Sequence, residues 1–333
     1  MYKLNFLQYK NMQNLHIKDS LSLNILSNNE DYISLEDSFK KEFSFESLNY
    51  FSFCKSGFLS LLLQLNKKGK IAVSLGETQS LIDACEIFCS LGFDILYLDL
   101  NKDGSVNLDK LKDQKIDFLF ISSYTVDTFY KNNLENVKKL TDAKIISNAS
   151  ASFDKNSDVI YFDSYKLTGF STKSIILFNQ NLFEEQAIFE KDGISLNNIF
   201  QSLKNQKFEN SMKEIFKEKL ENSLKDNLYY FIDNKNSLEY TLHFALKGIK
   251  ARELIRTLAL DEILISNGEG CSLGLSKPSR VIQAMGYDEL TSRNAITLSF
   301  EKSYSISEID KIVNLISKRY LQIKVLNKPS YKE

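Results

Sequence analysis

A cysteine within a glycine-rich segment is the residue whose setting most suggests covalent chemistry. Cys271 lies in residues 267–274, NGEGCSLG, which contain three of the 12 glycines of the chain. A flexible loop that follows an expected strand at 262–265 can present a thiol to a cleft, whereas a structural cysteine normally lies on an apolar face. The loop alone is equally compatible with a plain turn that contains a cysteine.

A lysine between two expected strands is the second candidate. Lys166 lies in residues 163–169, DSYKLTG, after an expected strand at 159–162 and before another at 174–178. At the carboxyl edge of a parallel sheet, a lysine can form a Schiff base with a carbonyl cofactor, and Ser164 and Thr168 could hold a phosphate. Without further context, a lysine between two strands is more often simply solvated.

The other cysteines and the histidines indicate structure rather than chemistry. Cys85 and Cys89 recur at helical spacing and are expected in the core, and Cys54 is expected to be structural. The only two histidines, His16 and His243, lie in unlike contexts, which argues against a histidine-based metal site or a serine–histidine triad. No CxxC pair is present, and a cytosolic chain would keep its thiols reduced.

Composition excludes several classes of function. The 333 residues carry 42 basic and 43 acidic side chains and are 43% hydrophobic, as in ordinary globular proteins. A net charge of −1 argues against nucleic acid as a partner, because such binding needs a basic surface. No stretch approaches the roughly 18 apolar residues of a membrane helix, and the first residues lack the apolar centre of a signal peptide. We therefore expect a cytoplasmic protein without a membrane partner.

Apolar runs alternate with amphipathic segments in the first half of the chain. This order predicts an α/β fold with a mostly parallel sheet between helices. The expected strands are 71–75, 95–100, 116–121, 143–147, 159–162 and 174–178, and the expected helices are 58–65, 78–91 and 134–140.

The second half of the chain has a different sequence pattern, which predicts a second, smaller α+β domain. A final helix is expected at 307–320, with Ser307 and Asp310 as a capping box. The expected organisation is an irregular N-terminal segment at 1–50, a large cofactor-binding domain at 51–195, linking helices at 196–227, and a small domain at 228–333 that carries the Cys271 loop.

Taken in order, these segments resemble the cysteine desulfurases, which are class V, fold-type I pyridoxal-phosphate enzymes of the nitrogen-fixation type. Residues 268–286, GEGCSLGLSKPSRVIQAMG, are similar to the family's mobile loop and following helix, GSACSS and EPSHVLxAMG. The other similar segments are 163–166 to SGHK, 98–111 to YLxVDxDGxIDLExL, 293–300 to RxSIRxSxG, and 305–310 to TxEEID. The resemblance covers residues 50–320 and implies a fold-type I architecture with a large domain and a smaller C-terminal domain.

The resemblance implies pyridoxal phosphate as cofactor and L-cysteine or a related amino acid as substrate. Lys166 would hold the cofactor as a Schiff base and transfer protons. Cys271 would attack the substrate sulfur and carry it as a persulfide, with release of alanine, to a sulfur-acceptor protein for iron–sulfur cluster assembly or another use. Family members are homodimers. The cofactor-binding residues implied are Lys166, Ser164, Asn148, Ser56 and Thr78.

Several positions depart from the family pattern. Asn148 replaces the aspartate that pairs with the pyridine nitrogen, and Thr78 replaces the histidine that stacks on the ring. Val126 and Ala151 replace an asparagine and a glutamine near the cofactor, and Thr297 replaces the arginine that binds the substrate carboxylate. A YLDxAATT-like opening is missing, so the resemblance is to a divergent, N-terminally shortened member.

Three functions remain open on these residues. We favour a divergent desulfurase, because Cys271 and Lys166 are both retained. A degenerate, non-catalytic homologue that acts as a binding or scaffold subunit is the first alternative. Another class V aminotransferase or lyase is the second, and Thr297 would suit a substrate without an α-carboxylate in the usual place.

Overall fold

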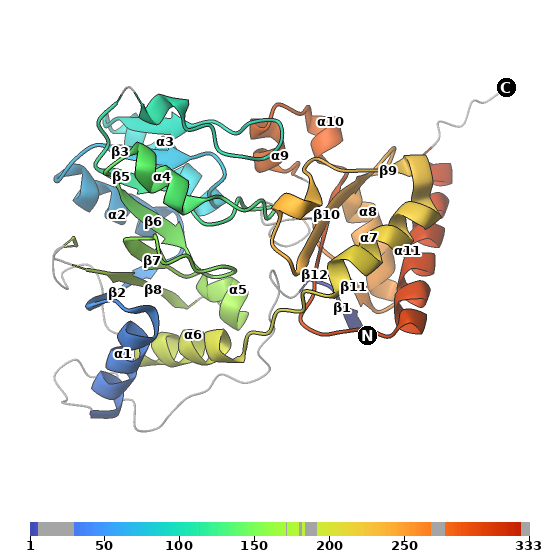
Figure 1. Cartoon of the computed structure of the whole chain (residues 1–333), viewed down its shortest axis with the longest axis horizontal. Helices are drawn as coiled ribbons and strands as arrows, with labels where there is room; N and C mark the ends of the chain where they lie inside the picture. Colours follow the sequence, from blue (N-terminus) through green and yellow to red (C-terminus); the bar gives the residue numbers. More distant parts are fainter. Residues whose placement is uncertain are drawn as a thin grey trace.

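Two domains, each built on its own sheet, lie side by side in the computed structural model (Figure 1). The structure describes residues 1–5, 30–112, 114–170, 172–179, 182–183, 192–267 and 277–327. Within these ranges, no helix combines the length and the apolarity that a membrane crossing requires.

A seven-stranded sheet forms the centre of the large domain, in the order β2-β8-β7-β6-β5-β3-β4. Neighbouring strands are parallel except at β8, which is antiparallel to both β7 and β2. The predicted α/β fold with a mostly parallel sheet is therefore confirmed. The strands are β2 Ser47–Ser52, β3 Ile71–Ser74, β4 Ile95–Leu98, β5 Phe118–Phe120, β6 Lys144–Asn148, β7 Val159–Tyr161 and β8 Lys173–Phe178.

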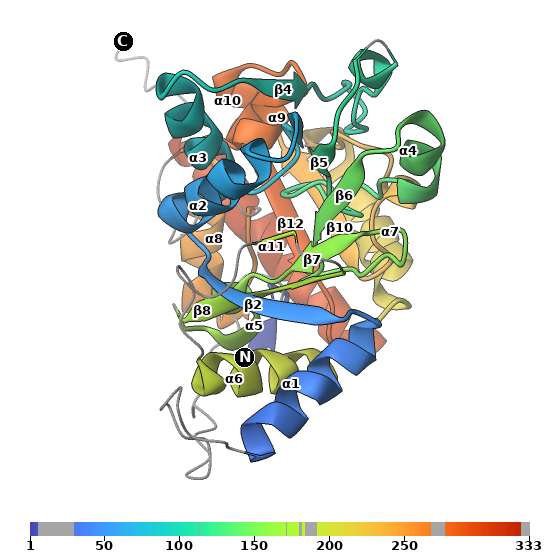
Figure 2. The same cartoon turned by 90° about the vertical axis from the view of Figure 1, so that its left-hand side faces the viewer.

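Both faces of this sheet are buried, which explains why its strands read as continuous apolar runs. Successive side chains of a strand point to opposite faces, so Ile71 and Val73 join one core while Ala72 joins the other. Helices cover the first face (Figure 2), and the second face packs against α4 and the small domain. The helices are α1 Glu30–Phe43, α2 Lys55–Asn66, α3 Gln79–Ser90, η1 Asp109–Leu111, α4 Leu134–Leu140, α5 Ser164–Thr168 and α6 Gly193–Asn205.

The small domain has a three-stranded antiparallel sheet in the order β12-β10-β9, and a parallel pair formed by β1 and β11. Phe244 and Ile296 face the core under its helices, whereas His243 and Thr297 alternate with them and face the large domain. Its elements are β1 Tyr2–Lys3, α7 Met212–Leu224, η2 Lys225–Asn227, β9 Leu228–Tyr229, η3 Asn234–Asn236, β10 Thr241–Leu246, α8 Ala251–Leu260, β11 Ile263–Leu264, α9 Arg280–Ala284, α10 Glu289–Ser292, β12 Ala295–Ser299 and α11 Ile306–Leu326.

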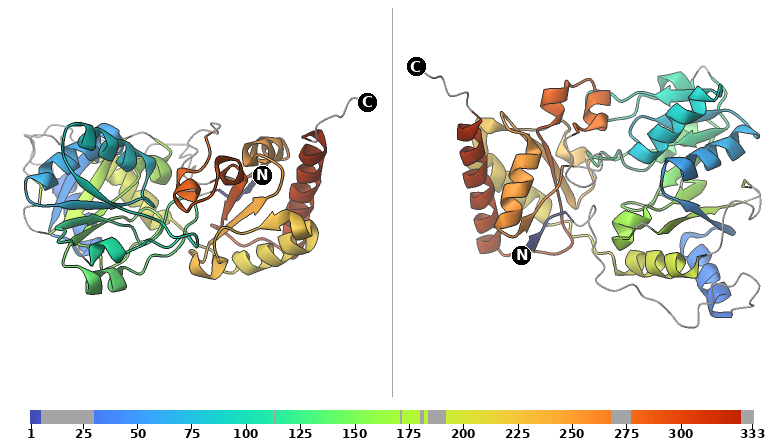
Figure 3. Two further views of the ribbon diagram at one scale, coloured as in Figure 1. Left: turned by 90° about the horizontal axis from the view of Figure 1, so that it is seen from above. Right: turned by 180° about the vertical axis from the view of Figure 1, so that it is seen from behind.

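The chain crosses between the domains over a shorter segment than the expected linker at 196–227. Helix α6 packs against α1 and α5 of the large domain, whereas α7 packs against α11 of the small one. The crossing therefore falls between residues 205 and 212. The N-terminal segment is divided too, because β1 pairs within the small domain while α1 and β2 belong to the large one (Figure 3).

Two local predictions are wrong. Cys89 is exposed rather than in the core, although Cys85 on the same helix is fully buried. The last helix begins one residue earlier than expected, at Ile306, and its capping box joins Ser305 and Glu308 instead of Ser307 and Asp310. Glu308 has the longer side chain that can reach back to the N-cap backbone N–H, at 2.8 Å.

Candidate active site

The carboxyl ends of five parallel strands meet at one edge of the large sheet, where α/β proteins bind their ligands. Asn148 ends β6, and the segments that follow β2, β3 and β7 carry the other predicted cofactor-binding residues, namely Ser56, Thr78, Ser164 and Lys166. Since β8 runs in the opposite direction, its first residue also lies at this edge. The fold thus gathers on one edge residues that lie far apart in the sequence.

Lys166 lies on the short helix α5, which its own neighbours cap. The Asp163 side chain accepts a hydrogen bond from the backbone N–H of Lys166 at 3.1 Å, and Gly169 ends the helix with φ at 78°. The Nζ atom of Lys166 is buried. Burial lowers the pKa of this amine to about 8, although the carboxylates of Asp163 and Asp127 favour its charged form. A neutral amine is therefore accessible near neutral pH, as attack on a carbonyl requires.

Asn148 is the last residue of β6 and is fully buried. Its Oδ1 atom accepts hydrogen bonds from the backbone N–H of Ser150 at 3.0 Å and from the Ser150 hydroxyl at 2.6 Å. Ser150 Oγ in turn accepts the backbone N–H of Asp163 at 2.6 Å, which links this amide to the helix of Lys166. The Nδ2 atom of Asn148 is buried and has no partner among the residues that the structure describes.

Thr78 caps the N-terminus of α3 and is only 3% exposed. Its hydroxyl is buried and makes no hydrogen bond within the described ranges. The Ser164 hydroxyl, in contrast, donates to the carbonyl of Thr172 at 2.8 Å, so it can still accept through its lone pairs. A buried polar atom without a partner is rare in a protein, and Thr78 therefore suggests a ligand contact.

Ser56 lies exposed in the first turn of α2, beside Cys54. The two side chains are 3.0 Å apart at their oxygen and sulfur atoms. Burial raises the pKa of the Cys54 thiol, but hydrogen bonds from Ser56 and the backbone of Gly57 outweigh this effect and lower it overall. The interpretation of Cys54 as purely structural thus missed its place at a helix N-terminus, where backbone N–H groups favour negative charge.

Glu77 is a buried acid at the same edge, and it was not among the predicted site residues. Its carboxylate accepts the backbone N–H of Ser122 at 2.6 Å, and the hydroxyls of Ser122 and Tyr161 at 3.0 Å each. Burial raises the pKa of Glu77 to about 7, although these hydrogen bonds favour the ionised form. Its only signal in the sequence is its position beside Thr78, which replaces the ring-stacking histidine of the family.

The segment that leads into α9 docks on this edge from the small-domain side. Arg280 donates to the carbonyl of Leu75 at 2.6 Å and to that of Glu77, and Ser279 donates to the carboxylate of Asp127. Cys271 itself lies outside the described residues, so its place remains a prediction.

Thr297 has neutral surroundings where the resemblance leads one to expect an arginine. Its hydroxyl donates to the backbone carbonyl of Asp127 at 3.2 Å and lies 3.0 Å from Nδ1 of His243. Burial lowers the pKa of His243 to about 3, so this imidazole is uncharged at neutral pH. The position therefore offers no cation to a carboxylate.

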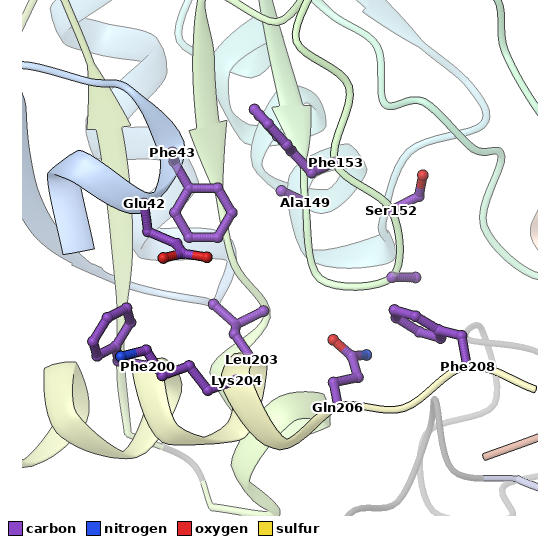
Figure 4. A pocket seen from close by; sticks show the side chains of 11 residues that line it. Glu42, Phe43, Ala149, Ser152, Phe153, Phe200, Leu203, Lys204, Gln206 and Phe208 are labelled. Carbon is purple, nitrogen blue, oxygen red and sulfur yellow. The ribbon is translucent and has the colours of Figure 1, made fainter. Parts of the chain in front are cut away.

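A cavity of about 180 Å³ lies between α1, α6 and the segment after β6 (Figure 4). Phe43, Phe200 and Phe208 line it, together with the charged side chains of Glu42 and Lys204. None of the predicted site residues that the structure describes lines this cavity, although Ala149 and Ala151, which follow Asn148 at the carboxyl end of β6, do.

No protein-family model matches the chain. Part of it is 27% identical over 84 residues to an IscS-like cysteine desulfurase of Mycobacterium tuberculosis, covering 25% of this chain and 21% of that protein. The chain is also 25% identical over 95 residues to cysteine desulfurase IscS of Rickettsia peacockii, covering 28% of this chain and 23% of that protein. The chain thus spans less than a quarter of the length of these curated relatives.

Solved structures match much more of the chain. A NifS-like protein superposes with a TM-score of 0.69 over 87% of each chain, at 16% identity. SspA in complex with cysteine gives a TM-score of 0.70 over 92% of this chain and 100% of that one, at 15% identity. CsdA of Escherichia coli, a cysteine desulfurase, gives 0.64 at 14% identity, over 91% of this chain and 89% of that one. These likenesses confirm the predicted fold-type I architecture, and short parts of the chain are similar in sequence to cysteine desulfurases.

Proposed function

We propose that the chain is a pyridoxal-phosphate-dependent desulfurase that takes sulfur from L-cysteine or a related amino acid. The observation that carries this proposal is the buried amine of Lys166, whose pKa burial lowers to about 8, at the carboxyl edge of the sheet. The two curated relatives and one fold neighbour are named as cysteine desulfurases, which supports the same class of reaction.

The residues at this edge fit pyridoxal phosphate. Lys166 offers an amine for the aldehyde carbon, and Thr78 Oγ1 and Asn148 Nδ2 are buried polar atoms without partners in the described part of the chain. Such atoms cost free energy unless a ligand or water satisfies them. When bound, the cofactor supplies a ring that withdraws electrons from the substrate.

Each proposed residue then has a distinct role. Lys166 holds the cofactor and moves a proton at Nζ, for which a lowered pKa is suited. Ser56, at the N-terminus of the 12-residue helix α2, and Ser164 bind the phosphate. Cys271 attacks the substrate sulfur: the carbon–sulfur bond breaks, a sulfur–sulfur bond forms on Cys271, and alanine leaves. The persulfide then passes to an acceptor protein, for iron–sulfur cluster assembly or another use.

The substrate carboxylate must be recognised differently from the expected pattern. Thr297 is bonded to a backbone carbonyl and to an uncharged His243, so it cannot replace an arginine. The proposed substrate class is still L-cysteine and related amino acids. A homodimer in the cytoplasm is part of the same proposal. The comparisons favour neither a non-catalytic homologue nor another class V aminotransferase or lyase.

Cofactor uptake by the purified chain tests the first half of the proposal. When pyridoxal phosphate is added, an absorption band should appear near the boundary between the ultraviolet and the visible. This band should be lost in Lys166→Ala. Lys213→Ala is the matched control, because burial also lowers the pKa of Lys213 to about 8, but its amine donates to Ser237 and Leu238 in the small domain. A chain that takes up no cofactor would overturn the proposal.

Sulfur transfer tests the second half. L-Cysteine should yield alanine and a persulfide on the protein, and both should be lost in Cys271→Ser. Cys89→Ser should behave as the wild type, since Cys89 is an exposed thiol on α3, away from the carboxyl edge. If wild type and Cys271→Ser are equally silent while cofactor is bound, the proposed sulfur chemistry is wrong.

A further inference from the structure

We propose that Asn148 keeps the pyridine nitrogen of the bound cofactor unprotonated, by donating its Nδ2 hydrogen to the nitrogen lone pair. This inference rests on the proposed function, because it requires pyridoxal phosphate at this edge. It assigns Asn148 a role opposite to that of an aspartate, which would keep the nitrogen protonated.

The orientation of the Asn148 amide is fixed by its neighbours. A backbone N–H can only donate, so the 3.0 Å contact with Ser150 N identifies the bonded Asn148 atom as the carbonyl oxygen. The Ser150 hydroxyl adds a second donor to this oxygen at 2.6 Å. The NH2 group must therefore point the other way, where it is fully buried without a partner in the described ranges.

The same hydrogen bonds tie this amide to the lysine that would hold the cofactor. Ser150 Oγ accepts the backbone N–H of Asp163, so its own hydrogen is directed to Asn148 Oδ1. Asp163 in turn caps the helix of Lys166 by accepting its backbone N–H. The NH2 group of Asn148 and the amine of Lys166 are thus positioned by one connected set of bonds.

The nearby acids are occupied by other donors. Glu77 accepts hydrogen bonds from Ser122 and Tyr161, and Asp127 accepts one from Ser279. Asp163 accepts from the backbone of Lys166. The group at the end of β6 that faces the ligand is therefore a neutral donor, and a nitrogen that accepts from it cannot also carry a proton.

This arrangement narrows the class of reaction. Without a positive charge on its nitrogen, the ring withdraws electrons less strongly and stabilises less negative charge at the substrate carbon. Amino-group transfer, which relies on that stabilisation at both half-reactions, is disfavoured.

Magnetic resonance of cofactor isotope-labelled at the ring nitrogen tests this inference without measuring turnover. In the loaded wild-type chain, the nitrogen should give the chemical shift of an unprotonated pyridine across neutral pH. In Asn148→Asp it should move to the protonated position. In Asn148→Leu it should stay unprotonated, while the dissociation constant of the cofactor rises about tenfold because one hydrogen bond is lost.

The outcomes separate this inference from the proposed function. If the chain takes up no pyridoxal phosphate in the absorption assay, both are overturned together. If it takes up the cofactor but the wild-type nitrogen is protonated, this inference alone is wrong. An unchanged nitrogen signal in a loaded Asn148→Asp chain would also overturn it, because the ring would then lie elsewhere.

Discussion

The imidazole of His243 lies with Nδ1 3.0 Å from Oγ1 of Thr297, across neighbouring strands of the small-domain sheet. The Thr297 hydroxyl donates its single hydrogen to the carbonyl of Asp127 at 3.2 Å, so its oxygen must accept the Nδ1 hydrogen of His243. The tautomer of His243 follows: Nδ1 carries the hydrogen and Nε2 is a buried acceptor. A neutral pair thus joins the two domains at the position where the resemblance leads one to expect an arginine.

Thr297→Val is expected to destabilise the chain by about 1–3 kcal/mol, because it leaves a buried donor on His243 unsatisfied. Denaturant unfolding of both proteins measures the loss. The double variant with His243→Leu should cost less than the sum of the two single changes, since it removes donor and acceptor together. Strict additivity would show that the two side chains do not interact.

Lys166 is expected to become reactive at a lower pH than an ordinary lysine. Burial lowers its pKa to about 8, so the fraction of neutral, nucleophilic amine rises as the pH increases through that value. The chain can be labelled with an amine-reactive reagent at several pH values, with the labelling rate of Lys166 followed by mass spectrometry. The pH at which this rate is half of its maximum is the labelling midpoint. Ordinary lysines titrate near 10.4.

Asp163→Asn refines this measurement. Asparagine also caps helices, so α5 should persist while the carboxylate that favours the charged amine is lost. The labelling midpoint of Lys166 should therefore fall further. A midpoint that rises would contradict the assignment of Asp163 as a stabilising charge.

Much of the large domain could be predicted because its strands are buried on both faces and read as apolar runs. Strand β2, Ser47–Ser52, was missed because it lies at the edge of the sheet and mixes polar with apolar residues. Helix α1, Glu30–Phe43, lies in the segment expected to be irregular with only short helices, because charged residues interrupt its apolar stripe. Residues buried on one side only leave a weaker pattern.

The candidate site was predictable only in part. Motif similarity proposed Lys166 and Asn148 as candidates, and the fold gathers both at one edge. The contact between His243 and Thr297 depends on the register of two strands more than 50 residues apart, for which the sequence has no local signal. The hydrogen bonds by which Ser150 links Asn148 to Asp163 likewise depend on the folded loop after β6, for which the sequence has no local signal.

The capping box of α11 gives a direct comparison of two serines. Ser305→Ala removes the N-cap acceptor for Glu308 and should lower the free energy of unfolding by about 1 kcal/mol. Ser307, the residue expected from the sequence to cap, lies within the first turn. Ser307→Ala should therefore change the free energy of unfolding by only a few tenths of a kcal/mol. Denaturant unfolding distinguishes the two, and equal losses would mean that Ser305 is not the cap.

Glu77 should make the stability of the chain depend on pH. Its pKa is raised by burial from 4.5 to about 7 in the folded chain, so the protonated form favours folding. This contribution is fully present below pH 4.5 and is lost as the pH rises to about 7. Relative to Glu77→Gln, which stays neutral, the wild type should lose about 3 kcal/mol across that range.

Unfolding free energies of both proteins at several pH values measure this difference. Glu135→Gln is the control, because Glu135 is an exposed residue of α4 and its ion pair with Lys139 lowers its pKa instead of raising it. Relative to Glu135→Gln, the wild type should therefore lose no stability as the pH rises. A flat difference for Glu77→Gln would mean that Ser122 and Tyr161 stabilise the Glu77 carboxylate enough to offset its burial, and that it is ionised throughout.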